Sequence, residues 1–129
     1  MNRFAGITHA LLRIVSGLLF IFPGGMKLLH WYGGMPVPMT PLLMVAGWLE
    51  LVGGPLIMLG LLTRPVAFIL SGEMAFAYFM GHMFKTPDAP VFIPLLNGGN
   101  AAILFCFACL YLACAGGGVW SADAMMKKK

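Results

Sequence analysis

The sequence predicts an all-α integral membrane protein, an up-down four-helix bundle with both termini in the cytoplasm. Of its 129 residues, 60% are hydrophobic and only 9% are charged, whereas soluble domains carry about 25% charged residues. Four apolar segments come close to the roughly 20 residues that a helix needs to cross a bilayer. Short connections rich in proline and glycine join them, so consecutive helices should be antiparallel neighbours.

The four spans are predicted within one domain, residues 1–129, at 8–29, 42–62, 66–83 and 94–116. The connections read "HWYGGMPVPMTP", "TRP" and "KTPDAP". Proline lacks the N–H that a helix interior needs, so each of these stretches should end one helix and begin the next. The architecture is therefore expected to consist of spans and tight turns, with the bilayer as its main partner.

The basic residues predict the orientation. With four spans, both termini share one side of the membrane with the turn at 63–65, and that side holds Arg3, Arg64 and the lysine run at 127–129. The opposite side holds only Lys27 and Lys85. Because Lys and Arg gather on the cytoplasmic side, both termini should be cytoplasmic. The basic residues are otherwise scattered, which gives no reason to expect a nucleic-acid partner.

Glu50 lies well inside the second span. A mid-helix carboxylate costs about 3 kcal/mol on insertion, and each Leu, Ile or Val offsets about 0.3–0.6 kcal/mol, so this leucine-rich span can carry one. The residues three and four positions away are all small: Ala46, Gly47, Gly53 and Gly54. Small residues let another helix approach closely, so Glu50 should face the inside of the bundle.

A first polar layer is predicted around Glu50. Taking a rise of about 1.5 Å per residue, Asn97 and Asn100 of the fourth span lie near its depth, and Lys27 lies close by. We expect Glu50 to accept a hydrogen bond or a proton, and the two asparagines to act as orienting donors.

A second polar layer is predicted below the first. It pairs Glu73 of the third span with Arg13 of the first, which would be its counter-charge. The two carboxylates, Glu50 and Glu73, differ in depth by about 6 Å, which is close enough to share a proton. Such residues either pin helices together through interhelical hydrogen bonds or form a ligand or proton site, and the sequence leaves both readings open.

Two weaker patterns concern redox and metal chemistry. Cys106 and Cys109 have the C-x-x-C spacing of redox pairs, but they lie inside an apolar helix, where cysteine behaves as a small hydrophobe. Methionine and histidine are also frequent on the non-cytoplasmic side, and both are soft ligands suited to Cu(I). In a chain with eleven methionines such neighbours arise easily by chance. The candidate metal ligands are His30, His82, Met80 and Met83, with Met26, Met35 and Met39 nearby.

Four stretches of the chain resemble the DoxX family of small four-helix bacterial membrane proteins. They are "LLRIVSGLLFIFPGGMKL", "ELVGGPLIMLGLLTRP", "NGGN" and "GGGVWSAD", in the order in which the family has them. Two positions depart from the family pattern. Asn100 stands where many relatives have an acid, and Val119 stands where an arginine is common. The resemblance implies a multi-pass protein of the bacterial inner membrane, often linked to oxidoreductase systems such as a thiosulfate:quinone oxidoreductase.

Three functions remain open at this point. The first is a subunit of, or accessory to, a quinone-linked membrane oxidoreductase, without its own redox centre and with quinone as a possible cofactor. Its polar core around Glu50 and Glu73 would hold the quinone headgroup or a proton. The second is a small proton-coupled or metal-handling transporter. The third is a structural scaffold for another membrane protein, or for a second copy of the chain.

Overall fold

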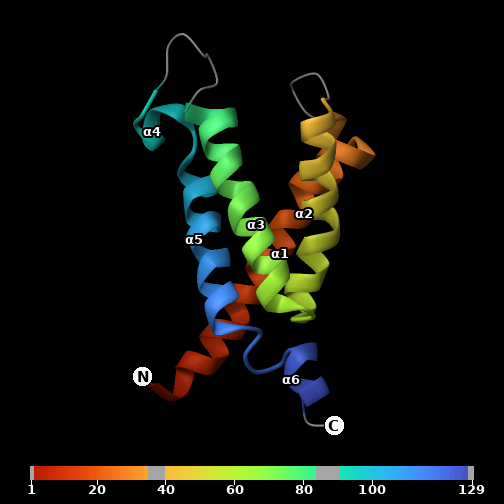
Figure 1. The fold of residues 1–129 in the computed structure, drawn as a ribbon, viewed down its shortest axis with the longest axis vertical. Coiled ribbons are helices and arrows are strands. Elements are labelled where there is room, and N and C mark those ends of the chain that lie inside the picture. The colour runs from red at the N-terminus through yellow and green to blue at the C-terminus, as the bar shows by residue number, and fades with distance from the viewer. Residues whose placement is uncertain (1, 35–39, 84–90, 128–129) are drawn as a thin grey trace.

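The computed structural model describes residues 2–34, 40–83 and 91–127, and over these residues the protein is helical without strands. Four helices form the bundle in Figure 1: α1 (Ala5–Leu29), α2 (Pro41–Leu59), α3 (Thr63–Ala77) and α5 (Asn100–Ala115). Short helices α4 (Pro94–Asn97) and α6 (Ala122–Lys127) flank α5, and 3-10 turns occupy Asn2–Phe4 and Trp31–Gly33. The predicted all-α bundle is confirmed.

Helix length and surface composition show that the bundle is a membrane protein. Among the described residues, three segments are long and apolar enough to cross a bilayer: Ala5–Leu29, Pro41–Leu59 and Thr63–Met83. The fourth bundle helix, α5, is apolar but has only 16 residues. Large apolar side chains point outward along the bundle, for example Leu104 with 71% of its surface exposed and Phe68 with 66%. Such a surface is suited to lipid rather than to water.

The fourth predicted span, 94–116, is wrong as a single helix. The chain breaks after α4 at Gly98, whose φ of +73° is left-handed, and restarts at Asn100. The third span also departs from a regular helix, because α3 continues as a π-helical turn over Tyr78–Met83. Both irregularities lie at the same end of the bundle, which we call the α4 end. The opposite end, which holds α6 and both termini, is the α6 end (Figure 1).

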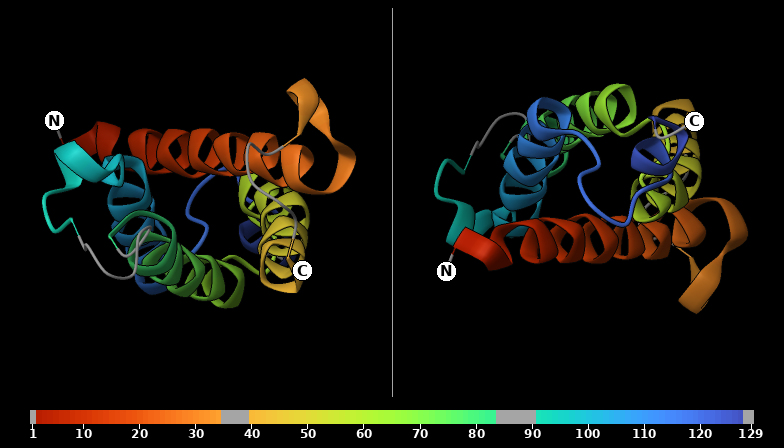
Figure 2. Two further views of the ribbon diagram at one scale, coloured as in Figure 1. Left: turned by 90° about the horizontal axis from the view of Figure 1, so that it is seen from above. Right: turned by 90° about the horizontal axis from the view of Figure 1, so that it is seen from below.

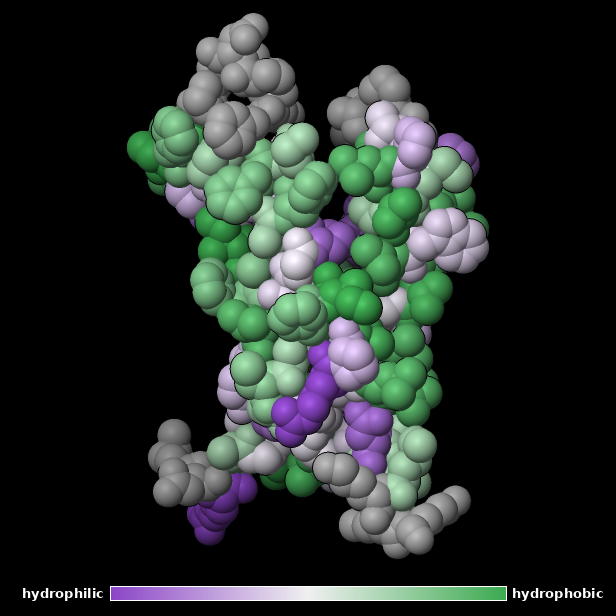
Figure 3. All heavy atoms as spheres, viewed as in Figure 1, coloured by the Kyte–Doolittle hydropathy of each residue, from purple (hydrophilic) through white to green (hydrophobic). Residues whose placement is uncertain are grey.

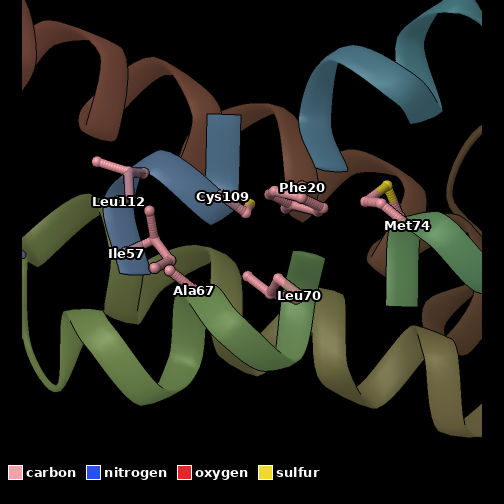
Figure 4. Close-up of a cluster of buried hydrophobic side chains, with 7 residues drawn as sticks. All are labelled: Phe20, Ile57, Ala67, Leu70, Met74, Cys109 and Leu112. Carbon is pink, nitrogen blue, oxygen red and sulfur yellow. The ribbon is translucent and has the colours of Figure 1, made fainter. Parts of the chain in front are cut away.

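The bundle consists of two helix pairs. Helix α1 packs along α2, and α3 packs along α5, while contacts between the pairs are fewer. The pairs diverge toward the α4 end, as the side view and the views along the bundle show (Figures 1 and 2). A core of buried apolar side chains fills the space between the pairs (Figure 4): Phe20, Ile57, Ala67, Leu70, Met74, Cys109 and Leu112.

The C-terminal segment closes the α6 end. Arg13 is fully buried, and its guanidinium donates to backbone carbonyls of residues 58, 117, 119 and 120. The Asp123 carboxylate accepts from the backbone N–H groups of Leu62 and Thr63, each at 2.9 Å, and so satisfies donors at the start of α3. Arginine has five N–H donors and can bind several carbonyls at once. These hydrogen bonds hold the C-terminal segment against the ends of the helices.

Glycine sets the distance between α1 and α2. A Cβ atom on Gly17 would lie 2.5 Å from the Gly54 carbonyl oxygen and 2.6 Å from the Met58 backbone nitrogen. Both of those atoms belong to the α2 backbone, which cannot move aside cheaply. The two helices are therefore in backbone contact, as small residues permit in membrane bundles.

We expect Gly17→Ala to separate α1 from α2 and to lower the free energy of unfolding by about 1–3 kcal/mol, since overpacking a close contact has this cost. Gly72→Ala in α3 is the control, because a Cβ atom there would meet nothing within 4 Å. It should be neutral or stabilising by up to about 1 kcal/mol through helix propensity. Thermal unfolding in detergent measures both, and equal effects of the two changes would contradict the packing argument.

Candidate functional site

A buried ion pair joins α1 to α2. The Lys27 ammonium lies 2.9 Å from Oε1 and 2.8 Å from Oε2 of Glu50, and the side chains are only 10% and 2% exposed. Lys27 comes from the last turn of α1. Gly24, one turn earlier, lets α1 reach α2, because a Cβ atom there would lie 2.6 Å from the Leu51 nitrogen. The predicted inward orientation of Glu50 and its proximity to Lys27 are confirmed.

Glu73 of α3 is the third member of this group, which we call the Lys27–Glu50–Glu73 cluster. Its carboxylate is near enough to interact with both Glu50 and Lys27. Its two oxygens are buried, and neither has a hydrogen-bond partner among the described residues. An unsatisfied buried polar group costs about 1–3 kcal/mol, and more when it is charged. The cluster holds two carboxyls and one ammonium, so a proton or a ligand has to balance the second acid.

A cavity of about 260 Å³ adjoins the cluster between the two helix pairs. Its polar wall consists of Lys27, Glu50 and His82. The rest of the wall is apolar, with two aromatic rings: Leu19, Phe20, Pro23, Met74, Ala77, Ala101, Ala102 and Phe105. Figure 3 shows hydrophilic atoms at the bottom of a hollow between the helices, surrounded by hydrophobic surface. The site therefore combines one ionic patch with walls suited to a ring and an alkyl chain.

His82 is placed on the cavity by the π-helical turn that follows α3. Its Nδ1 lies 3.2 Å from the backbone oxygen of Asn97. Sequence reasoning proposed His82 only as a metal ligand and missed this place on the cavity wall. No sequence signal marks a π-helical turn, although such turns are frequent at functional sites.

Asn97 does not join Glu50, contrary to the prediction. Its amide nitrogen donates to the Tyr78 hydroxyl at 3.2 Å and to the Val91 carbonyl at 2.8 Å, and its side-chain oxygen accepts from the Gly99 N–H at 2.8 Å. The side chain therefore organises the break between α4 and α5. Asn100 is exposed in the first turn of α5.

The prediction that Arg13 is the counter-charge of Glu73 is wrong. The hydrogen bonds of Arg13 go to backbone carbonyls at the α6 end, and the carboxylate that acts on its charge is Asp123. Depth along the helices was estimated well enough to place Lys27 and Glu73 near Glu50. It could not show that the "GGGVWSAD" segment folds back under the helices and occupies the arginine.

Among the described residues, the cysteines form no disulfide, and the His, Cys, Asp and Glu side chains form no metal-binding group. The three cysteines are free: Cys109 belongs to the apolar core, and Cys106 contacts Ser71. Over residues 2–34, 40–83 and 91–127, no group of three or more His, Cys, Asp or Glu side chains is placed to hold a metal ion. Of the other candidate ligands, Met80 is 55% exposed and His30 is exposed at the end of α1. Met35 and Met39 lie outside the described residues.

Comparison with known proteins identifies the family. The DoxX family model matches residues 8–83, which include all three members of the cluster. The chain belongs to the DoxX family. A protein of Haemophilus influenzae (strain ATCC 51907 / DSM 11121 / KW20 / Rd), described as an uncharacterized protein, is 41% identical over 128 residues, covering 93% of this chain and 91% of that protein. No solved structure matches the chain significantly.

The two acids of this DoxX protein should respond oppositely to neutralisation. Glu50→Gln removes the carboxylate that forms the ion pair with the buried Lys27 ammonium, and we expect a loss of about 3–5 kcal/mol in the free energy of unfolding, as for other broken buried ion pairs. Glu73→Gln removes a carboxylate that has no hydrogen-bond partner among the described residues and is repelled by Glu50, so stability should be unchanged or higher.

Unfolding in detergent, followed by tryptophan fluorescence, measures the difference between these two variants. Equal losses would mean that Glu73 contributes to helix packing as much as Glu50 does. That result would favour the purely structural interpretation of the cluster.

Proposed function

We propose that this DoxX protein is a membrane subunit of a quinone-linked oxidoreductase system and binds the quinone headgroup beside the Lys27–Glu50–Glu73 cluster. The supporting observation is the cavity, where a buried ion pair meets apolar and aromatic walls within the bundle. The proposal includes insertion in the bacterial inner membrane with both termini cytoplasmic. The Lys and Arg bias of the sequence supports this orientation.

The residues of the cavity fit a quinone headgroup. A lysine ammonium has three N–H donors, and two of them are engaged by Glu50. The third is available for a carbonyl oxygen of a ligand. Phe20 and Phe105 on the wall offer ring faces for a planar headgroup. Leu19 and Ala101 are exposed at the rim, so an isoprenoid tail can leave the cavity toward lipid.

A bound quinone supplies two-electron redox chemistry coupled to proton uptake and release. The residues of this chain bind and orient it. Lys27 donates to a headgroup oxygen, and Glu50 holds the ammonium in place. Glu73, whose oxygens have no partner among the described residues, holds or releases a proton beside that oxygen. Electrons come from a membrane-protein partner that packs on the apolar outer surface.

Two other functions predict different behaviour. A proton-coupled transporter would carry a substrate across the membrane and would show no preference for quinones. A scaffold would need the bundle and its apolar surface but not the cavity. Changes that fill or neutralise the cavity while preserving the fold therefore separate the three functions.

Binding of a short-chain ubiquinone analogue to the detergent-purified protein tests the proposal. We expect Lys27→Met to weaken binding at least tenfold, since a hydrogen bond to a charged group is worth about 1.5–3 kcal/mol and 1.4 kcal/mol is a factor of ten. Ala101→Phe, at the exposed rim, should block the cavity without changing any charge and weaken binding similarly.

The control is Ser71→Ala, which removes a hydrogen bond to the Cys106 carbonyl at 2.8 Å, away from the cavity wall. This variant should bind the analogue like the unchanged protein. Absence of saturable binding to the unchanged protein, or equal binding by all four proteins, would refute the proposal.

A further inference from the structure

Two breaks in helix regularity bring His82 to the mouth of the cavity. The π-helical turn at Tyr78–Met83 carries the imidazole, and the interruption at Gly98 and Gly99 turns the Asn97 carbonyl toward it. In regular helices that carbonyl would be engaged within its own helix. This arrangement holds the His82 side chain at the edge of the cavity.

The hydrogen bond to Asn97 fixes the protonation pattern of the ring. A carbonyl oxygen can only accept, so Nδ1 of His82, at 3.2 Å, carries the hydrogen. Nε2 is then the nitrogen that gains or loses a proton. The carbonyl also stabilises the imidazolium when Nε2 is protonated, because it accepts from the Nδ1–H in both states.

The charged groups that share the cavity with His82 belong to one cluster. Helix α1 contributes Lys27, α2 contributes Glu50, and Glu73 of α3 lies beside both. The π-helical turn itself adds Tyr78, whose hydroxyl accepts from Asn97 and lies 3.3 Å from the Phe92 carbonyl. Helix α5 contributes neutral residues to the cavity wall, and α4 consists of neutral residues. Among the described residues, His82 is therefore the titratable side chain that lines the cavity together with Lys27 and Glu50.

The α6 end of the bundle is occupied by other groups. At the α6 end the Arg13 guanidinium is buried and donates to carbonyls of the C-terminal segment. Along α1, Phe20 of the apolar core (Figure 4) lies between Arg13 and Lys27. Met74 and Phe20 belong both to that core and to the cavity wall. The cavity thus begins where the core ends, and its polar wall faces the α4 end.

We propose that His82 passes protons between water at the α4 end and the Lys27–Glu50–Glu73 cluster. The inference deepens the proposed function by assigning the proton route of that site, and it rests on the cluster as proton acceptor rather than on a bound quinone. Histidine suits the task because its charge changes between about pH 5 and 8.

The transfer balances without any redox partner. An N–H bond forms at Nε2 as an O–H bond of hydronium breaks, which gives an imidazolium and water. That N–H bond then breaks as an O–H bond forms on a carboxylate of the cluster, which restores the neutral ring. The reverse sequence releases the proton, and the Nδ1–H bond to Asn97 is kept throughout.

Infrared spectroscopy of the full-length protein in lipid vesicles tests the proposal without a quinone. A protonated carboxyl in the cluster gives a C=O stretching band that shifts when D₂O replaces water, and its loss in Glu73→Gln or Glu50→Gln assigns it. We expect the deuterium shift of this band to be at least tenfold slower in His82→Gln. His30→Gln is the matched control, because His30 is exposed at the α4 end and does not line the cavity.

Chemical rescue separates proton transfer from a structural role of His82. In His82→Ala, millimolar imidazole added to the vesicles should restore the exchange rate, since the free base can occupy the space of the lost ring. Unchanged exchange in His82→Gln, or slow exchange in His82→Ala that imidazole does not restore, would overturn the proposal. So would the absence of any cluster carboxyl band in the unchanged protein. Failure to bind quinone would refute the proposed function and leave this result intact.

Discussion

The ion pair between Lys27 and Glu50 is the interaction on which the architecture of the site depends. Two opposite charges are tolerable inside an apolar bundle only when they are held together and away from lipid. Holding them requires α1 and α2 to approach at backbone distance, and glycines at the contact permit this. The tightly packed α1–α2 pair thereby forms a rigid wall, against which the α3–α5 pair can diverge and leave a cavity.

The buried polar groups at the two ends of the bundle differ in how their hydrogen bonds are satisfied. At the α6 end, the Arg13 guanidinium donates to backbone carbonyls and Asp123 caps the start of α3, although Nε of Arg13 and the Thr63 hydroxyl have no hydrogen-bond partner among the described residues. At the α4 end, the second carboxylate of the cluster has no partner among the described residues. Charged side chains hold the C-terminal segment against the helices at the α6 end, whereas toward the α4 end a carboxyl without a hydrogen-bond partner among the described residues lies near a cavity.

The sequence predicted the fold and half of the site because both depend on local patterns. Apolar length located the helices, and small residues around Glu50 predicted its inward orientation. The partner of Arg13 was mispredicted because it comes from a segment more than a hundred residues away, whose path no periodicity describes. The break at Gly98 was missed because an apolar stretch with a "GG" pair is compatible both with one continuous span and with two separate helices.

Glu73 gives the strongest reason to regard the cluster as a functional site. Stability alone would replace an unsatisfied buried carboxyl with an apolar residue, since each such group lowers the free energy of unfolding. In natural proteins, poorly packed residues and buried polar groups without hydrogen-bond partners are found mainly at functional sites. Here the unmatched acid lies beside a matched ion pair, a cavity and an oriented imidazole. A helix-pinning role explains Lys27 and Glu50, but it leaves Glu73 and the placement of His82 without a cause, whereas proton exchange accounts for all four residues.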